Sequence, residues 1–366
     1  MPIYMDVHIV PGVKARDVAE AHSMDLLIQN DHACKCMTYW IDEARETIFC
    51  LIEAPHKEAV IAMHDKSHGL VPHKIIEVDS TVVESFLGRI YDPEDAKAGD
   101  DGLKVFSDPS YRILVVTVIT DPVLLQYKLG KEKANELLRQ HNQVIRKNLD
   151  LYGGREVEQE GHGFIISFTS AAKAVACALA IQKEVSAEEA DILGFKISIN
   201  SGEPIETSNK IFGDTVQLAQ HMCAHANCLQ VALASSVKAL VAKDYFQNSV
   251  NNFLTLTPQD EEVLKLLFDK LEAHWQDSEF DVDDYCLAMA MSKSQLYRKT
   301  IALTGLSPNL LIKEFRLEKA KELMKKQYYN ISQVTFDAGF TSPSYFTKCF
   351  KKKYGLLPVN YVEMLH

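Results

Sequence analysis

The sequence contains no run of some twenty consecutive apolar residues, although 47% of its 366 residues are hydrophobic. A helix needs about 20 such residues to cross a bilayer, so the pattern excludes a membrane-spanning helix. Residues 1–6 also lack the basic and apolar pattern of a secretory leader. We therefore expect a cytoplasmic protein with no membrane partner.

The cysteines show no dense, regular framework. All eight are scattered along the chain, at positions 34, 36, 50, 177, 223, 228, 286 and 349. Disulfide frameworks are typical of small secreted domains, in which cysteine is far more frequent. The scatter favours reduced thiols.

The chain has fewer basic than acidic residues. Lys and Arg number 39 against 50 Asp and Glu, a net charge of −11, which excludes a protein that coats nucleic acid indiscriminately. However, residues 291–366 carry 13 Lys and Arg against 5 Asp and Glu, or +8, which leaves −19 for residues 1–290. A compact basic module on an acidic body is typical of a protein that reads a DNA site.

The chain is long enough for two or three domains. The polar, glycine-containing stretch 93–102 indicates a break. We predict a ferredoxin-like, metal-binding sensor domain (1–92), a linker (93–108), a second α+β domain (109–250) and an all-α domain (257–366).

Residues 1–92 alternate between strand and helix patterns in the order βαββαβ. Strands are expected at 4–10, 36–41, 47–53 and 74–78, and helices at 13–30 and 54–67. This order predicts a ferredoxin-like sandwich, with both helices on one face of an antiparallel sheet.

Histidines are the chemical feature of this region. Asp6 and His8 point to one face of their strand, because strand side chains alternate. His64 and His68 are four residues apart on a helix, a spacing that can present two imidazoles to one metal ion. Cys36 lies on another predicted strand. These five residues are the candidate ligands, and the alternative is that they are surface or core-edge side chains.

The same region resembles a small family of ferredoxin-like proteins whose known members bind nickel. The resemblance rests on residues 5–12, 38–40 and 63–69. It implies a transition-metal cofactor, either nickel or another ion. Imidazole suits nickel, zinc and copper alike, so the sequence does not choose among them.

Residues 109–245 resemble a class III nucleotidyl cyclase domain. The sequence segments that carry the resemblance are 152–157, 161–163, 197–203 and 212–219. The pattern of the region is α+β, with one long helix expected over residues 121–148.

The departures from that family are decisive for function. The two aspartates that hold its metal ions correspond to Val118 and His162, and its asparagine and arginine to Gln217 and His221. Mg²⁺ needs anionic oxygens, which valine and neutral imidazole do not supply. We therefore expect no catalytic residues and no enzyme activity. The domain is left to dimerise or to sense a ligand, and whether it binds nucleotide stays open.

Residues 330–355 have the pattern of a helix-turn-helix. A short helix precedes a turn at Gly339, and Ser342-Pro343 begins a second helix that carries a lysine run. A similar unit ends in the helix 292–304, and residues 307–327 connect the two as a helix of about 30 Å. Successive major-groove faces lie about 34 Å apart, so one chain can reach two of them.

These residues closely resemble the DNA-binding domain of the AraC/XylS family of bacterial transcription regulators. The match is carried by residues 292–299, 304–309, 316–323, 338–346 and 350–358, and Ala290 replaces the glycine frequent in the first turn. The resemblance implies double-stranded DNA as partner, and we add RNA polymerase and a second copy of the chain as expected partners.

The predicted DNA-contacting residues lie on the second helix of each unit. Arg298 is the candidate for a bidentate contact to guanine, and Lys299, Lys351 and Lys352 are candidates for phosphate. The other groove-facing candidates are Ser294, Gln295, Tyr297, Ser344, Tyr345 and Lys348. For Tyr345 a place in the core is the alternative.

These observations lead to a DNA-binding transcription regulator controlled by a metal or a small ligand. Two alternatives stay open: an active nucleotidyl cyclase coupled to DNA binding, and a metal-storage protein.

Overall fold

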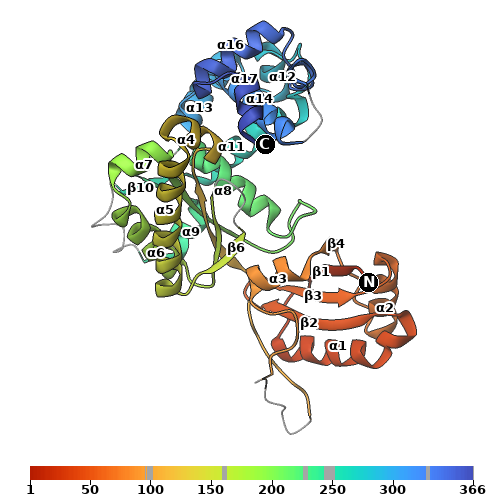
Figure 1. Cartoon of the computed structure of the whole chain (residues 1–366). Coiled ribbons are helices and arrows are strands. Elements are labelled where there is room, and N and C mark those ends of the chain that lie inside the picture. Colours follow the sequence, from red (N-terminus) through yellow and green to blue (C-terminus); the bar gives the residue numbers. More distant parts are fainter. Residues whose placement is uncertain are drawn as a thin grey trace.

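The structure of the protein, a computed structural model, describes residues 1–94, 96, 102–158, 163–225, 230–242, 252–326 and 330–365. Figure 1 shows an amino-terminal α+β region, a middle α+β region and an all-helical carboxy-terminal region. The predicted fold class, α+β followed by all-α, is confirmed. Part of the predicted linker and the position of His162 lie outside the described residues.

The amino-terminal region is a four-stranded antiparallel sheet in the order β2-β3-β1-β4. Its elements are β1 (Ile3–Ile9), α1 (Ala15–Ile28), η1 (Gln29–His32), β2 (Lys35–Asp42), β3 (Thr47–Glu53), α2 (Lys57–Ser67) and β4 (Lys74–Val78). The order β-α-β-β-α-β and this strand arrangement are those of the predicted ferredoxin-like sandwich.

The two faces of this sheet pack against different partners. On one face Tyr4 and Ile52 pack with Val60 and Met63 of α2, and Ile48 packs with Val18 of α1. The opposite face packs against α3 (Ser80–Leu87) and against side chains of the middle region. Because side chains alternate along a strand, β1 directs Asp6 and His8 toward the helices, and Met5 and Val7 toward the middle region.

The middle region has a six-stranded sheet in the order β10-β9-β8-β5-β7-β6. Its strands are β5 (Arg112–Val118), β6 (Arg155–Glu158), β7 (Ile165–Phe168), β8 (Lys196–Gly202), β9 (Val231–Leu233) and β10 (Phe253–Thr255). Its helices are α4 (Pro122–Leu129), α5 (Lys131–Tyr152), α6 (Ala171–Glu184), α7 (Ala187–Leu193), α8 (Gly213–His225) and α9 (Ser235–Leu240). Helices α5 and α6 lie on one side of the sheet and α8 on the other (Figure 1).

One prediction for this region was wrong. The single helix expected over residues 121–148 is two helices, because Gly130 adopts φ +83° and ψ 152° between α4 and α5. This conformation lies far from the helical region, and glycine adopts it without steric cost.

The carboxy-terminal region contains α11 (Pro258–His274), α12 (Val282–Ala288), α13 (Lys293–Thr304), α14 (Pro308–Lys325), α15 (Ile331–Asp337), α16 (Pro343–Tyr354) and α17 (Pro358–Leu365). The pairs α12–α13 and α15–α16 are the two predicted helix-turn-helix units. The 18 residues of α14 connect them over about 27 Å. Among the helices described, none combines the length and apolar character that a membrane crossing requires.

Polar contacts join the three regions in series. Lys74 on β4 donates to the backbone carbonyls of residues 206, 207 and 208, at 2.7–3.0 Å, and the Thr47 hydroxyl donates to Glu203 at 2.8 Å. The same loop holds Asp214, at the start of α8, through the Ser208 N–H at 2.6 Å. Asp214 in turn accepts from Lys265 of α11 at 3.0 Å. A chain of contacts therefore runs from β4 to the helical region.

Candidate metal centre and nucleic-acid interface

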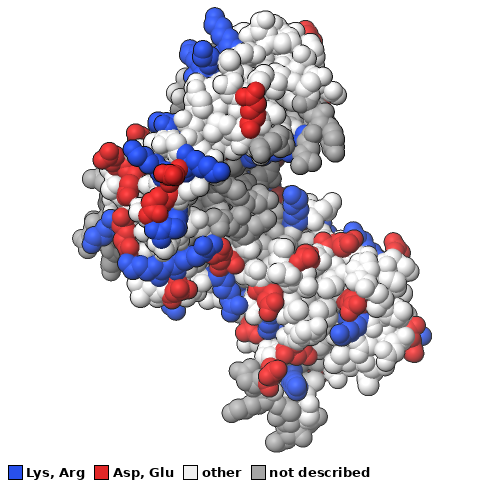
Figure 2. Space-filling model, viewed as in Figure 1, with Lys and Arg blue, Asp and Glu red and all other residues white. Residues whose placement is uncertain are grey.

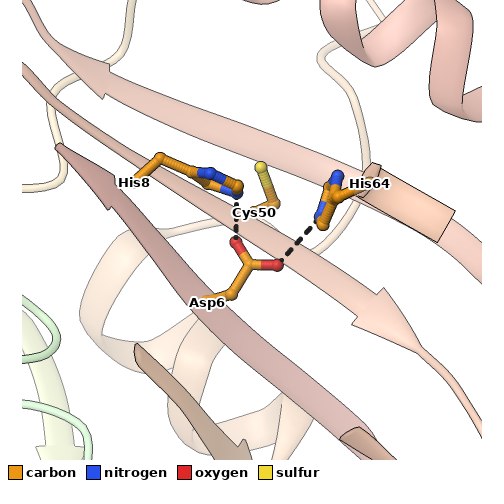
Figure 3. Close-up of side chains that lie close together, drawn as sticks. All are labelled: Asp6, His8, Cys50 and His64. Carbon is orange, nitrogen blue, oxygen red and sulfur yellow. Dashed lines mark hydrogen bonds and ion pairs between the residues drawn. The ribbon is translucent and has the colours of Figure 1, made fainter. Parts of the chain in front are cut away.

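The amino-terminal sheet and α2 bring three of the predicted metal ligands together. The Asp6 carboxylate lies 3.0 Å from His64 Nε2 and 3.3 Å from His8 Nε2 (Figure 3). All three side chains are buried, Asp6 and His64 at 1% exposure. A carboxylate and two imidazoles in the protein interior form a donor set suited to a transition-metal ion.

Cys50 completes this group and was missed by the sequence analysis. Asp6 and Cys50 are directly opposite in the β1–β3 pairing, so both side chains project from the same face of the sheet. The ligand atoms of Asp6, His8, Cys50 and His64 all lie within 4.8 Å of one another. Only the strand register reveals this neighbour, because Cys50 is 44 residues from Asp6 in the sequence.

His68 belongs to a second group, on the other side of the His64 ring. His64 Nδ1 lies 3.1 Å from His68 Nε2 and 3.2 Å from Asp25 Oδ2. His68 Nε2 is 3.3 Å from Asp25 Oδ1. Asp25 comes from α1, is 3% exposed and was also missed. The sequence does contain a pattern that could have identified Asp25. Val18, His22 and Asp25 share one face of α1, which is buried, and a buried acid needs a partner.

The charges of these groups depend on each other. Burial lowers the pKa of His64, but the carboxylates of Asp6 and Asp25 outweigh it and raise that pKa to about 10. Burial raises the pKa of Asp6 and of Asp25, but the neighbouring histidines hold both well below the usual range. Burial and the carboxylates raise the pKa of the Cys50 thiol. Without a metal, a proton on His64 therefore supplies the positive charge between two buried carboxylates.

Cys36, the fifth predicted ligand, is not part of either group. Its thiol lies 3.6 Å from the Met63 sulfur in the apolar layer between the sheet and α2. Burial raises the pKa of this thiol, as expected for a cysteine in an apolar layer.

A small pocket borders both groups. Its polar lining consists of His8, His22, Asp25, Cys50, His64 and His68. Asp6 does not line this pocket and lies beneath it, at 1% exposure.

The two helix-turn-helix units have the turns and caps that the sequence predicted. Ala290 adopts φ 50° in the first turn and Gly339 adopts φ +74° in the second. A Cβ at Gly339 would collide with the carbonyl oxygen of Trp275, so this turn requires glycine. The Ser292 and Ser342 hydroxyls accept backbone N–H groups at the starts of α13 and α16.

The first predicted DNA-reading helix, α13, buries Leu296, Thr300 and Leu303. Its predicted groove-facing residues lie on the other side: Ser294, Gln295 and Arg298 are exposed, and Tyr297 and Lys299 are half-buried. Some of these side chains already have intramolecular partners. The Gln295 side-chain oxygen accepts from the Ser292 N–H and hydroxyl, both at 2.9 Å, and the Tyr297 hydroxyl accepts from Asn309 at 3.1 Å.

The second helix, α16, buries Phe346, Cys349 and Phe350. Its predicted DNA-contacting residues, Ser344, Tyr345, Lys348, Lys351 and Lys352, are exposed. Tyr345 is 53% exposed, which excludes the core position considered as an alternative. Figure 2 shows Lys and Arg side chains gathered at the end of the molecule where α16 lies.

Within the described ranges, no ion pair involves Arg298, Lys348, Lys351 or Lys352. Lys353 differs, because it pairs with Glu314 and Glu318 of α14. The exposed cations of α16 are thus free to meet phosphates, whereas Lys353 fixes α16 on α14.

The middle region does not assemble a two-metal carboxylate site in its described part. Val118 ends β5, and His162 lies outside the described residues. The His221 ring stacks on Phe268 of α11 at 3.9 Å. Asp121 is the carboxylate nearest to Val118 in the sequence. It is 3% exposed, and it accepts a hydrogen bond from the Tyr361 hydroxyl of α17 at 2.7 Å. Asp121 therefore contributes to the contact with the helical region.

Two family models match parts of the chain. Residues 285–364 match a helix-turn-helix domain, and residues 4–78 match the family described as nickel responsive protein SCO4226-like. The resemblances predicted for both ends of the chain are confirmed: an AraC-type helix-turn-helix domain at the carboxy terminus and a nickel-responsive-type domain at the amino terminus.

Curated relatives show similarity over shorter stretches. The chain is 37% identical over 108 residues to histidine kinase P4 of Formosa agariphila, covering 30% of this chain and 8% of the relative. It is 32% identical over 99 residues to the HTH-type transcriptional regulator MtrA of Neisseria gonorrhoeae, covering 27% and 31%. It is 26% identical over 110 residues to putative adenylate cyclase 3 of Rhizobium meliloti, covering 29% and 19%. The chain thus spans less than a third of the length of each of these relatives.

Among solved structures, SCO4226 from Streptomyces coelicolor A3(2) is 35% identical. The match covers 21% of this chain and 94% of that one, with a TM-score of 0.20.

Proposed function

We propose that the protein is a sequence-specific DNA-binding transcription regulator of the AraC type, whose DNA binding is controlled by a transition metal in its amino-terminal domain. The observation that carries this proposal is the pair of capped helices, α13 and α16, with exposed Arg298, Lys348, Lys351 and Lys352. The rigid α14 between them suits two successive turns of one DNA face. A cytoplasmic location is part of the proposal, since promoter DNA is there.

Selection of bound duplexes from a random pool tests DNA reading. We expect a defined site. Arg298→Ala should weaken binding by about 1–3 kcal/mol and relax preference at one base pair, whereas Lys348→Ala should weaken binding to all sequences alike. Arg139→Ala is the matched control, because Arg139 is an exposed cation of α5 that pairs with Glu136. An unselected pool after several rounds would refute the proposal.

For the metal, we propose that Asp6, His8, Cys50 and His64 hold the ion. The donor set of one thiolate, one carboxylate and two imidazoles suits nickel, zinc or copper better than magnesium or calcium. A bound cation would replace the proton that His64 otherwise keeps between Asp6 and Asp25, so metal binding should release protons.

Titration of the metal-free protein with nickel, zinc and copper salts tests the ligand set. Cys50→Ser should lower affinity by at least tenfold. Cys286→Ser, which alters another half-buried cysteine in the helical region, should not. Equal affinities of the two variants would remove Cys50 from the site.

We propose that the middle domain transmits the signal and forms a homodimer without cyclase activity. The polar contacts from Lys74 through the loop 203–208 and Asp214 to Lys265 supply a physical connection for that signal. The hydrogen bond that the Tyr361 hydroxyl donates to Asp121 supports the proposal that this domain has no cyclase activity, because it occupies the carboxylate nearest to Val118 in the sequence. RNA polymerase would be the partner at the promoter.

An assay for cyclic AMP or cyclic GMP, with Mg²⁺ or Mn²⁺, decides the catalytic question. The expected result is no product, and product formation would favour a cyclase coupled to DNA binding. Comparing DNA affinity with and without nickel in the wild type and in Lys74→Met tests transmission. Loss of the nickel effect with unchanged metal affinity is expected. A retained nickel effect would exclude Lys74 from the connection.

A further inference from the structure

The two ring nitrogens of His64 face two different sets of ligand atoms. Nε2 faces Asp6, with His8 and Cys50 close by. Nδ1 faces Asp25 and His68. One imidazole therefore belongs to both groups, and each group lies on its own side of the ring.

The second group has the dimensions of a metal site in its own right. Its three ligand atoms, His64 Nδ1, His68 Nε2 and Asp25 Oδ2, lie 3.1–3.4 Å from one another. An ion with tetrahedral bonds of 2.0–2.1 Å holds its ligands roughly 3.3 Å apart. The three atoms are thus already spaced for an ion, with the pocket leaving room for a further ligand.

A single ion cannot use both groups. The lone pairs of the two imidazole nitrogens point away from each other across the ring, so ions bound to them would be roughly 6 Å apart. A histidine can bind an ion at each nitrogen when it has lost both ring protons and become an imidazolate.

We propose that His64 bridges two divalent metal ions as an imidazolate. Asp6, His8 and Cys50 hold the inner ion, and Asp25 and His68 hold the outer one. This rests on the proposed metal-sensing function and extends it from one ion to two.

The charges of the site balance under this arrangement. Two divalent ions bring four positive charges. The carboxylates of Asp6 and Asp25, the thiolate of Cys50 and the imidazolate of His64 bring four negative charges. Neutrality matters here because Asp6, Asp25 and His64 are each at most 3% exposed, and an uncompensated charge at such a depth is strongly unfavourable. One ion alone would leave Asp25 without a full counter-charge.

The proton balance follows from the same scheme. Filling both sites releases the ring protons of His64 and the thiol proton of Cys50 to solvent, while His8 and His68 bind as neutral imidazoles. The first ion polarises the His64 ring and eases loss of its remaining proton. Loading should therefore be cooperative, which would give a regulator a steep response to metal.

The experiment uses the full-length chain, loaded with nickel(II) and, separately, with cobalt(II). Metal per chain is counted by mass spectrometry of the desalted protein, and the magnetic susceptibility of the cobalt form is followed with temperature. We expect two ions per chain and antiferromagnetic coupling, since an imidazolate transmits exchange between ions. His68→Gln and Asp25→Asn should each leave one ion and remove the coupling.

Controls separate failure of the bridge from failure of the proposed function. Asp65→Asn, an exposed acid on α2, should keep two coupled ions. Circular dichroism and retention of the inner ion show that the His68 and Asp25 variants are folded. One ion in the wild type, or two uncoupled ions, would refute the bridge while leaving metal sensing intact. No bound ion would refute both.

Discussion

Two buried histidines in different domains differ in what surrounds them, and their pKa values move in opposite directions. His64 lies between two carboxylates, which raise its pKa to about 10 although burial opposes this. His141 of α5 packs edge-on against Phe195 at 4.5 Å, and burial lowers its pKa to about 4. Within the described ranges, neither ring nitrogen of His141 has a hydrogen-bond partner.

This difference in pKa distinguishes a histidine of a candidate metal site, His64, from a histidine packed in a core, His141. Burial alone favours the neutral imidazole, and only neighbouring anions reverse that preference. A cluster that retains positive charge in the interior is a place where a metal ion can replace a proton. His221 is similar to His141, since it stacks on Phe268 and burial lowers its pKa to about 3. His141 and His221 therefore have the character of packing residues.

The largest expected effect comes from removing one carboxylate of the His64 cluster. In the metal-free protein, Asp6→Asn removes one of the two carboxylates that stabilise the buried positive charge of His64, together with its contact to His8, and should lower the free energy of unfolding by about 3–5 kcal/mol. Denaturant titration monitored by Trp40 fluorescence, in a Trp275→Phe background, reports on this domain, because Trp40 is fully buried in it.

Asp65→Asn is the matched control, with a change within about 0.5 kcal/mol expected for an exposed position. A loss below 1 kcal/mol for Asp6→Asn would mean that the charges in the cluster are independent of each other. The comparison with His141 would then lose its basis.

The second prediction concerns alkaline pH. The folded pKa of His64, about 10, lies above its unfolded value of 6.5. Between these values the folded state holds a proton that the unfolded state has lost, so stability is present below about pH 6.5 and falls as pH rises toward 10. The loss should reach several kcal/mol for the metal-free amino-terminal domain. Trp40-monitored unfolding at a series of pH values measures it, and a flat profile would contradict the charged state of His64.

The third prediction is the opposite slope in the middle domain. The folded pKa of His141, about 4, lies below 6.5, so between these values the unfolded state binds a proton that the folded state excludes. Stability should therefore fall by about 3 kcal/mol as pH drops from 6.5 to 4. Hydrogen exchange of the α5 and α6 amides, followed by mass spectrometry, isolates this domain. Constant opening free energies over this range would place a partner beside His141.

Sequence patterns predicted the part of the metal cluster that depends on local periodicity. Alternation along a strand set Asp6 and His8 on one face, and helical spacing paired His64 with His68. Cys50 and Asp25 were missed because they reach the cluster through strand register and through the packing of α1 on the sheet. Cys36 was included because it lies on one of the predicted strands of the same region. Its side chain instead points to Met63 in the apolar layer.

The helical region was more predictable than the middle region, for a physical reason. Helices α11, α12, α13, α15 and α16 begin with threonine, aspartate, serine or asparagine N-caps that act within one turn. Gly339 marks a turn that no other residue fits. In the middle region the break at Gly130 lies within continuous helical periodicity. The short strand β10 exists only through pairing with β9, which local sequence does not specify.

The smallest expected effect is a gain in stability at His141. His141→Leu replaces a buried imidazole without hydrogen-bond partners by an apolar side chain of similar size. Removing unsatisfied buried polar atoms should raise stability by about 1 kcal/mol at pH 7 and flatten the acid slope of the middle domain. The same change at His64 should destabilise the protein, because it leaves two buried carboxylates without a cation. Hydrogen exchange of the α5 amides at pH 7 and pH 5 measures both results for His141. A loss of stability with an unchanged dependence of stability on pH would show that its imidazole is bound by a partner, as that of His64 is.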